Sequence, residues 1–290
     1  MLRFSSLLIL LLATFACEQS DPAAGEQPEA TVTDSTITLQ EAEASKEAAA
    51  IAKTAPAIPE LSADFPEDQL VSLSGDHLAG LCDNQYGCLQ ETLYPLGWSP
   101  DGKFAYLLEE ANEAVQNTTI HLRIQDMDSD EILEEHTFKA SEQPGWTEDT
   151  DNYSVMGIWR SQETLYDSLL QIHQIRLGVG TQFYPLVIMK QRYAVNFTAQ
   201  DKLRQNVLFD IQEVDQHWLV ARKGERRKTI CKQTMGKYDL VIASQPLGGF
   251  HSPFEERLAV VDGLEKRGYE GPPNVLRLQL VGCDLEAGFE

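Results

Sequence analysis

Residues 94–102 read YPLGWSPDG, and the apolar run 104–108 follows directly. Within this stretch Pro100 fixes φ for the first central position of a tight turn, and the Asp101 side chain can bond to nearby backbone. Gly102 accepts the positive φ needed to leave the turn. Because apolar segments flank the turn on both sides, the stretch predicts two β-strands joined by a tight turn.

A degenerate copy of this stretch lies near the C-terminus. Residues 246–248 read PLG, as residues 95–97 do, and RLAVV at 257–261 corresponds to KFAYL at 103–107. The Asp-Gly pair of the first turn is replaced by FEE at 254–256. We therefore expect a second hairpin with a longer turn.

Residues 97–103, GWSPDGK, resemble the Trp-Ser-Pro-Asp-Gly-Lys signature of TolB-type β-propeller repeats. The resemblance covers about half of one blade, and no other SPDG lies between the two copies. A regular propeller needs about 4–8 blades of roughly 40 residues each. The resemblance therefore implies a mainly β fold of small, irregular propeller-like or sandwich-like antiparallel sheets.

The remaining pattern is also mostly β, with one or two short helices. Residues 118–124 alternate as a half-buried strand does, and 126–130 form an acidic turn. This turn does not match an EF-hand loop, because Glu131 and Thr137 stand where that loop needs Gly and Glu. Further strands are predicted at 183–189, 193–197, 207–214, 240–244 and 275–281. A helix is predicted at 161–170, with a strand at 169–175 as the alternative.

The N-terminus has the pattern of an export signal, predicted over residues 1–16. Arg3 gives it a basic start, and Leu7–Leu12 is apolar throughout. A spanning helix would need about 20 apolar residues, and polar residues follow Cys17 at once. Ala16 followed by Cys17 resembles the lipobox of bacterial lipoproteins, which implies that Cys17 is acylated and anchors the mature chain to the membrane. The alternative is ordinary signal cleavage, giving a periplasmic or secreted protein.

Two segments follow the signal. Residues 17–60 are poor in large apolar side chains and rich in Ala, Glu, Thr, Ser and Pro, so they predict a disordered tether. Its Ala-rich part, 42–53, follows a capping box and fits a spacer better than a partner-binding helix. Residues 61–290 have the length of one domain, which we expect to be β-rich.

Four further cysteines are Cys82, Cys88, Cys231 and Cys283. In an exported chain an even number predicts disulfides, and we expect Cys82 to pair with Cys88 and Cys231 with Cys283. The competing interpretation is a zinc site. No CxxC pair is present and the histidines do not cluster with the cysteines, so we expect no metal.

The net charge of −22 argues against nucleic acid as a partner, because binding phosphates requires a basic surface. One basic stretch, RKGERRK at 222–228, contrasts with the acidic chain. It predicts a solvated hairpin tip with Gly224 in the turn. The alternative is a site for an anionic partner such as a lipid headgroup or a glycan.

The sequence contains no motif of a common catalytic site, such as GxSxG, HExxH, a P-loop or a dinucleotide-binding GxGxxG. We expect no cofactor. His251 beside the second copy, Trp98 in the first, and Tyr269 in a loop rich in Gly and Pro are the candidate binding residues near one rim of the sheets. The sequence thus predicts a lipid-anchored envelope protein that binds or scaffolds another envelope protein or a glycan without catalysis. The alternative is an envelope hydrolase with active-site residues dispersed over the sheet loops.

Overall fold

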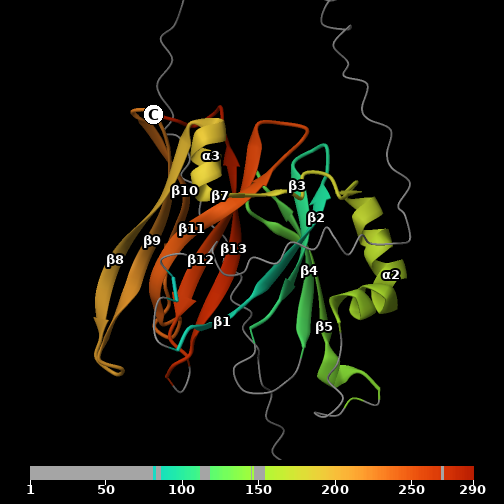
Figure 1. Cartoon of the computed structure of the whole chain (residues 1–290), viewed down its shortest axis with the longest axis horizontal. Coiled ribbons are helices and arrows are strands. Elements are labelled where there is room, and N and C mark those ends of the chain that lie inside the picture. The colour runs from blue at the N-terminus through green and yellow to red at the C-terminus, as the bar shows by residue number, and fades with distance from the viewer. Residues whose placement is uncertain (1–80, 83–85, 112–117, 145, 147–153, 269–270) are drawn as a thin grey trace, which may run out of the picture. The chain divides into compact units, whose positions relative to one another are not determined.

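The computed structural model describes residues 81–82, 86–111, 118–144, 146, 154–268 and 271–290. The elements begin with β1 (Cys88–Gln90), β2 (Thr92–Trp98), β3 (Lys103–Glu109), β4 (Thr119–Asp126), β5 (Ile132–Lys139), a 3-10 turn (Ala140–Glu142), α2 (Val155–Ile172), β6 (Arg176–Leu177), β7 (Phe183–Pro185) and α3 (Leu186–Tyr193). They continue with β8 (Val195–Asn206), β9 (Ile211–Lys223), β10 (Arg226–Thr234), β11 (Val241–His251), β12 (Arg257–Lys266) and β13 (Asn274–Asp284) (Figure 1).

These strands form three sheets. Sheet 1 has the order β5-β4-β3-β2-β6, sheet 2 has β1-β13-β12-β11-β7, and sheet 3 has β10-β9-β8. Among the described pairs only β1 and β13 run parallel. The predicted mainly β fold is confirmed, but the described strands do not form the four-stranded radial blades of a propeller.

The sheets are stacked, and β3 shows why. Its alternate residues Phe104, Tyr106 and Leu108 enter the core shared with sheet 2, whereas Ala105 and Leu107 enter the core shared with α2. A strand that is buried on both faces has little need of polar residues. Sheet 1 therefore lies between α2 and sheet 2.

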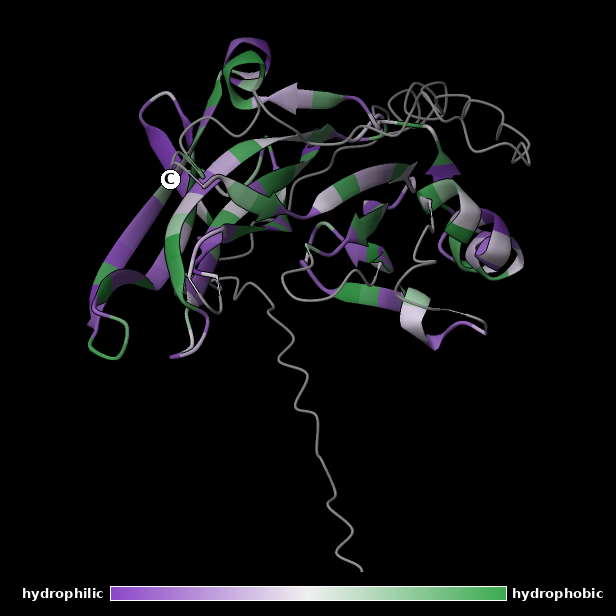
Figure 2. Ribbon diagram, turned by 60° about the horizontal axis from the view of Figure 1, so that its bottom comes forward, coloured by the Kyte–Doolittle hydropathy of each residue, from purple (hydrophilic) through white to green (hydrophobic). Residues whose placement is uncertain are grey.

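Strand β12 repeats this arrangement one layer further on. Ala259 and Val261 face sheet 1, and Leu258 and Val260 face the core shared with sheet 3. Figure 2 shows the resulting bands of hydrophobic and hydrophilic residues along the strands. The order of layers is α2, sheet 1, sheet 2 and sheet 3.

An aromatic cluster joins sheets 1 and 2. The ring centroids of Trp98 and Phe104 are 4.9 Å apart, and those of Phe104 and Phe250 are 5.2 Å apart. Phe183 adds a further contact to Phe250 at 5.5 Å. Tilted and offset ring pairs of this kind are worth roughly 0.5–1.5 kcal/mol each beyond their buried area.

The two similar sequence stretches form equivalent hairpins, β2–β3 and β11–β12. Each has a register shift at its PLG segment, between Pro95 and Gly97 in one and between Pro246 and Gly248 in the other. In each, the glycine lies opposite a short extra strand, β6 or β7. The degenerate repeat is therefore present in the structure, once in each five-stranded sheet.

The predicted turns are also present. Ser99 donates its N–H to the Lys103 carbonyl across the first hairpin turn, at 2.9 Å. Gly224 lies at the tip of the β9–β10 hairpin with φ +65°. The acidic turn closes when the Asp126 carboxylate accepts the N–H groups of Asp128 and Ser129.

Some predicted elements are corrected. Helix α2 contains the predicted helix but runs from Val155 to Ile172, so the alternative strand at 169–175 is not formed. The predicted strand at 183–189 ends at Pro185 and continues as α3, whose Met189 is buried against sheet 3. The strands predicted at 193–197 and 207–214 belong to a longer β8–β9 hairpin.

The disulfide predictions have mixed outcomes. Cys82 and Cys88 are bonded as predicted. Cys283 is a free, buried thiol, so the predicted pairing of Cys231 with Cys283 is not formed. Burial raises the pKa of Cys283 to about 12, and the residue packs as a small apolar side chain in the core between sheets 2 and 3. Cys17, the signal and the tether lie outside the described residues.

Neither helix in the described part of the chain is both long and apolar enough to cross a membrane.

The glycines of the two bulges allow a close approach of backbones. A Cβ atom on Gly97 would lie 2.0 Å from the carbonyl oxygen of Arg176, and one on Gly248 would lie 2.3 Å from that of Tyr184. We expect Gly97→Ala and Gly248→Ala each to lower the free energy of unfolding by about 1–3 kcal/mol in urea titrations. Gly224→Ala, which meets open space, loses only about 1 kcal/mol to its left-handed φ. Equal losses of stability at Gly97, Gly248 and Gly224 would contradict this interpretation. They would mean that contact with the neighbouring backbone does not set the need for glycine at the first two positions.

Candidate functional site

Trp98, one of the predicted binding residues, is part of the core. Its side chain is fully buried, and its indole N–H donates to the carbonyl of Gly180 at 3.3 Å. Trp98 comes directly after the register shift in β2, and its side chain lies on the face of β2 that packs on sheet 2. The structure therefore places Trp98 in the core and not at an exposed rim of the sheets.

His251 lies at the surface near α3. Its ring stacks on Tyr193 with centroids 5.0 Å apart, and its Nε2 is 3.6 Å from a carboxylate oxygen of Glu256. Burial lowers its pKa. It lies outside the cavity described next, and Tyr269 lies outside the described residues.

A cavity of about 410 Å³ lies between sheets 1 and 2, beside the aromatic cluster. Its walls come from β3, β4 and β5 on one side and from β12 and β13 on the other, and residues of β10 and β11 close it. Sites for small molecules usually measure about 300–1,000 Å³. The cavity is therefore large enough for a compact ligand.

Strand β4 supplies the polar side of this cavity. His121, Arg123 and Gln125 alternate along the strand and line the cavity, while Leu122 and Ile124 between them pack toward α2. Three polar residues on the inward face of a strand are unusual in a packed core. The alternation of residues 118–124 in the sequence predicts this strand, but it does not predict which residues the side chains of the strand contact.

Most charges in the walls are already paired. Paired groups hold one another in place and leave little net charge for a ligand. The pairs are Glu91 with Arg277, Arg123 with Glu135 at 2.6 Å, and Glu110 with His121 at 2.8 Å. The hydrogen bond from His121 lowers the pKa of Glu110.

Uncharged polar groups are fixed in the same way. Tyr106 donates its hydroxyl to Gln125 at 3.0 Å, and the Gln125 amide donates to the carbonyl of Leu280 in sheet 2 at 3.0 Å. Burial raises the pKa of Tyr106 to about 12, so the phenol stays protonated. These bonds connect the two walls of the cavity.

Asp130 is the exception among the wall residues. Asp130 is only 5% exposed, and its carboxylate oxygen Oδ1 accepts a hydrogen bond from the N–H of Gly282 at 2.6 Å. The other oxygen, Oδ2, is buried and has no hydrogen-bond partner among the described residues. Burial raises the pKa of Asp130 to about 7, and the carboxylates of Asp126 and Asp128 add to this effect. A buried acceptor without a donor costs stability, and Oδ2 itself is shielded from the open space of the cavity.

Comparison with protein-family models, with curated proteins and with solved structures finds no match to this chain.

A second polar cluster adjoins the cavity. His217 on β9 is fully buried, with Nδ1 2.8 Å from Asp201 and Nε2 2.9 Å from Asp262. Gln279, a residue of the cavity wall, donates to the same Asp262 oxygen at 2.8 Å. The cluster thus connects sheet 3 with sheet 2.

This cluster resembles a catalytic arrangement but lacks its chemistry. Ser244 Oγ lies 3.0 Å from His217 Nδ1, with Asp262 on the other nitrogen. Burial alone lowers the pKa of His217, but the hydrogen bonds to Asp201 and Asp262 outweigh it and raise this pKa to about 9. An imidazolium whose two N–H groups both donate to carboxylates cannot take a proton from Ser244 at neutral pH.

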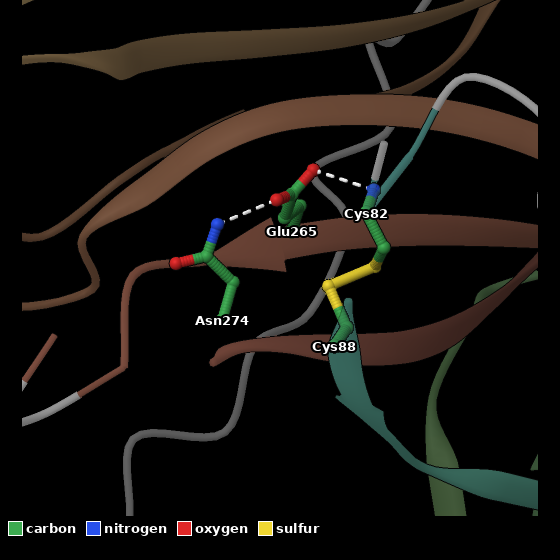
Figure 3. Close-up of a disulfide and its surroundings, with 4 residues drawn as sticks. All are labelled: Cys82, Cys88, Glu265 and Asn274. Carbon is green, nitrogen blue, oxygen red and sulfur yellow. Dashed lines mark hydrogen bonds between the residues drawn. A yellow bond between two sulfur atoms is a disulfide. The ribbon is translucent and has the colours of Figure 1, made fainter. Parts of the chain in front are cut away.

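One group of potential metal ligands exists in the described residues, formed by Cys82, Cys88 and Glu265. The two sulfurs are joined to each other, so neither is available as a thiolate. Glu265 instead accepts hydrogen bonds from the N–H of Cys82 at 2.9 Å and from the amide of Asn274 at 2.6 Å (Figure 3). These three residues therefore have a structural role, and we call the disulfide together with Glu265 the clasp.

The unpaired carboxyl gives a test that depends on pH. The pKa of Asp130 is about 7 in the folded protein and 3.8 in the unfolded chain. The protonated carboxyl therefore contributes its full stabilisation below pH 3.8. This contribution is lost as the pH rises through 7, because the folded protein then has to bury a charged carboxylate. Asp130→Asn should therefore raise the free energy of unfolding by about 1–3 kcal/mol at pH 8 and leave it nearly unchanged at pH 4, measured by urea titration.

Asp128→Asn is the control on the same turn, because it makes the same chemical change at a side chain that is 81% exposed, and the ion pair that it removes, with Arg257, is at the surface. It should change stability by less than about 0.5 kcal/mol at either pH. A destabilised Asp130→Asn variant at pH 8 would show that the carboxylate is better paired than described.

Proposed function

We propose that this chain is a lipid-anchored protein of the bacterial cell envelope whose β domain binds another envelope component and catalyses no reaction. In this proposal the signal is removed before Cys17, and Cys17 carries the acyl chains. Two or more acyl chains hold a protein stably on a bilayer. The segment after Cys17 serves as the tether. The TolB-like hairpin motif, with its degenerate second copy, is consistent with an envelope domain that binds partners.

The polar-walled cavity, with Asp130 among its lining residues, is the observation that carries the binding function. The ion pairs in the walls keep their charges occupied, so the ligand has to bring hydrogen-bond donors more than net charge. Hydroxyl and amino groups of a sugar have this chemistry, and the cavity encloses a volume of small-molecule size. A unit of an envelope glycan therefore fits better than a folded protein.

The described wall residues include no Ser, Thr or Cys that could act as a nucleophile, and three of their carboxylates, Glu91, Glu110 and Glu135, are held in pairs. The hydrolase alternative retains one supporting feature, the His121–Glu110 pair within the cavity. Both nitrogens of His121 are engaged, however, since Nδ1 lies 2.9 Å from the hydroxyl of Thr137.

A matched set of sugars tests the binding function. Glucosamine, glucose and gluconate are similar in size but carry an amino group, a hydroxyl group and a carboxylate, and they are compared at pH 8, where Asp130 is ionised. At ~10 mM we expect glucosamine to raise Tm most and gluconate least, because the carboxylate of Asp130 in the wall favours the amino group as a donor and repels the carboxylate of gluconate. Asp130→Asn should remove the difference between glucosamine and glucose, and Asp128→Asn should keep it. No shift with any of these sugars would contradict the proposed class of ligand.

Intact mass tests the anchor. The protein purified from its native envelope should begin at Cys17 and carry the mass of added acyl chains. A mass beginning at Cys17 without lipid, or at another residue, would make it a soluble exported protein and would leave the binding proposal to stand on the cavity alone.

A further inference from the structure

One end of the described domain differs from the rest in its surface chemistry. It consists of α3 (186–193) and the β9–β10 hairpin tip (222–228), which we call the basic end. Val195, just after α3, pairs with Lys223, so the ladder brings the end of the helix beside the tip. Figure 1 shows α3 at the same end of the domain as the C-terminus, which pairs with Arg227.

Positive charge is concentrated at the basic end. Its two segments contain seven basic residues and one acidic residue, Glu225, in a chain with a net charge of −22. The seven are Lys190, Arg192, Arg222, Lys223, Arg226, Arg227 and Lys228. A local excess of one sign produces a field that selects partners of the opposite sign.

Carboxylates offset these charges only in part, through Asp284, Glu286 and Glu290 on the C-terminal segment whose backbone bonds to the tip. None of the seven forms an ion pair within the described part of the chain, whereas basic residues elsewhere, such as Arg123 and Arg204, do. The ammonium of Lys223 donates to the Leu285 carbonyl at 3.0 Å. The Arg192 guanidinium donates to the hydroxyl of Tyr184 at 2.9 Å. These neutral partners position the cations and leave their charge available.

Apolar side chains are exposed beside the cations. On α3, Val187 is 66% exposed and Ile188 is 47% exposed, and Lys190 and Arg192 follow on the same short helix. The other side of the helix is anchored by Met189, which is fully buried. A rigid helix that presents aliphatic and cationic side chains together matches the interface of a bilayer, where headgroups meet acyl chains.

We propose that the basic end docks on the surface of an anionic phospholipid bilayer. The cations attract the headgroups, and Val187 and Ile188 enter the boundary with the acyl chains. A polyanionic glycan would satisfy the cations but leave the aliphatic pair in water, whereas the bilayer fits both. This contact is independent of the cavity and of acylation at Cys17.

Vesicle sedimentation tests this docking. Residues 17–290 with Cys17→Ser, which removes the acylation site, are mixed with vesicles of phosphatidylcholine containing phosphatidylglycerol or lacking it. We expect binding only to the anionic vesicles, weakened at high salt because the contact is electrostatic. Arg226→Glu with Arg227→Glu should reduce the binding constant by roughly tenfold or more. Val187→Ser with Ile188→Ser should reduce it without changing the dependence on salt.

Lys232→Glu with Lys237→Glu is the matched control, since it reverses the charge of two exposed basic residues on β10 and in the loop after it, away from the tip. This variant should bind the anionic vesicles as the parent does. The proposal is overturned if the parent protein does not bind anionic vesicles, or if the control variant loses as much binding as the tip variant. It is also overturned if the parent protein binds a soluble polyanion such as heparin but binds no vesicle. Circular dichroism of each variant checks that the fold is retained.

Discussion

The contact between Phe104 and Phe250 sets the spacing of sheets 1 and 2, and the cavity follows from it. On the side of β2 and β11, aromatic rings fill the space between the sheets. On the side of β4 and β13, the inward residues of β4 are polar and bond to each other or to the opposite wall. Because the rings prevent the sheets from closing further, the polar side retains open space.

The same region contains the charges that a core normally avoids. Glu91 and Arg277 neutralise each other, and His217 is held between two carboxylates. Such buried pairs add little net stability compared with apolar packing, so their value lies in fixing positions. Asp130 contributes an unfavourable buried acceptor instead. The proposed binding function would explain why the fold retains this group beside the cavity at some cost in stability.

Local chemistry made the hairpins predictable, because Pro100 and Gly102 have strong turn preferences. The apolar residues after Pro185 fit a helix or a strand equally well, and burial of Met189 decided between them. Trp98 was assigned to binding because aromatic residues serve cores and interfaces alike. The cavity was not predictable, since its residues come from strands of three sheets, far apart in the sequence. Only the inward polar face of β4 signalled it.

The clasp at the start of the domain also has a mechanical consequence. A pull on the N-terminal part of the chain reaches the domain at Cys82, and the bond to Cys88 prevents the loop between them from being drawn out. The load then passes to β1, which lies parallel to β13, and to Glu91, which accepts the N–H of Leu278. A parallel pair pulled along its axis must shear several hydrogen bonds at once. A pull along β1 would therefore load the β1–β13 hydrogen bonds together instead of one after another.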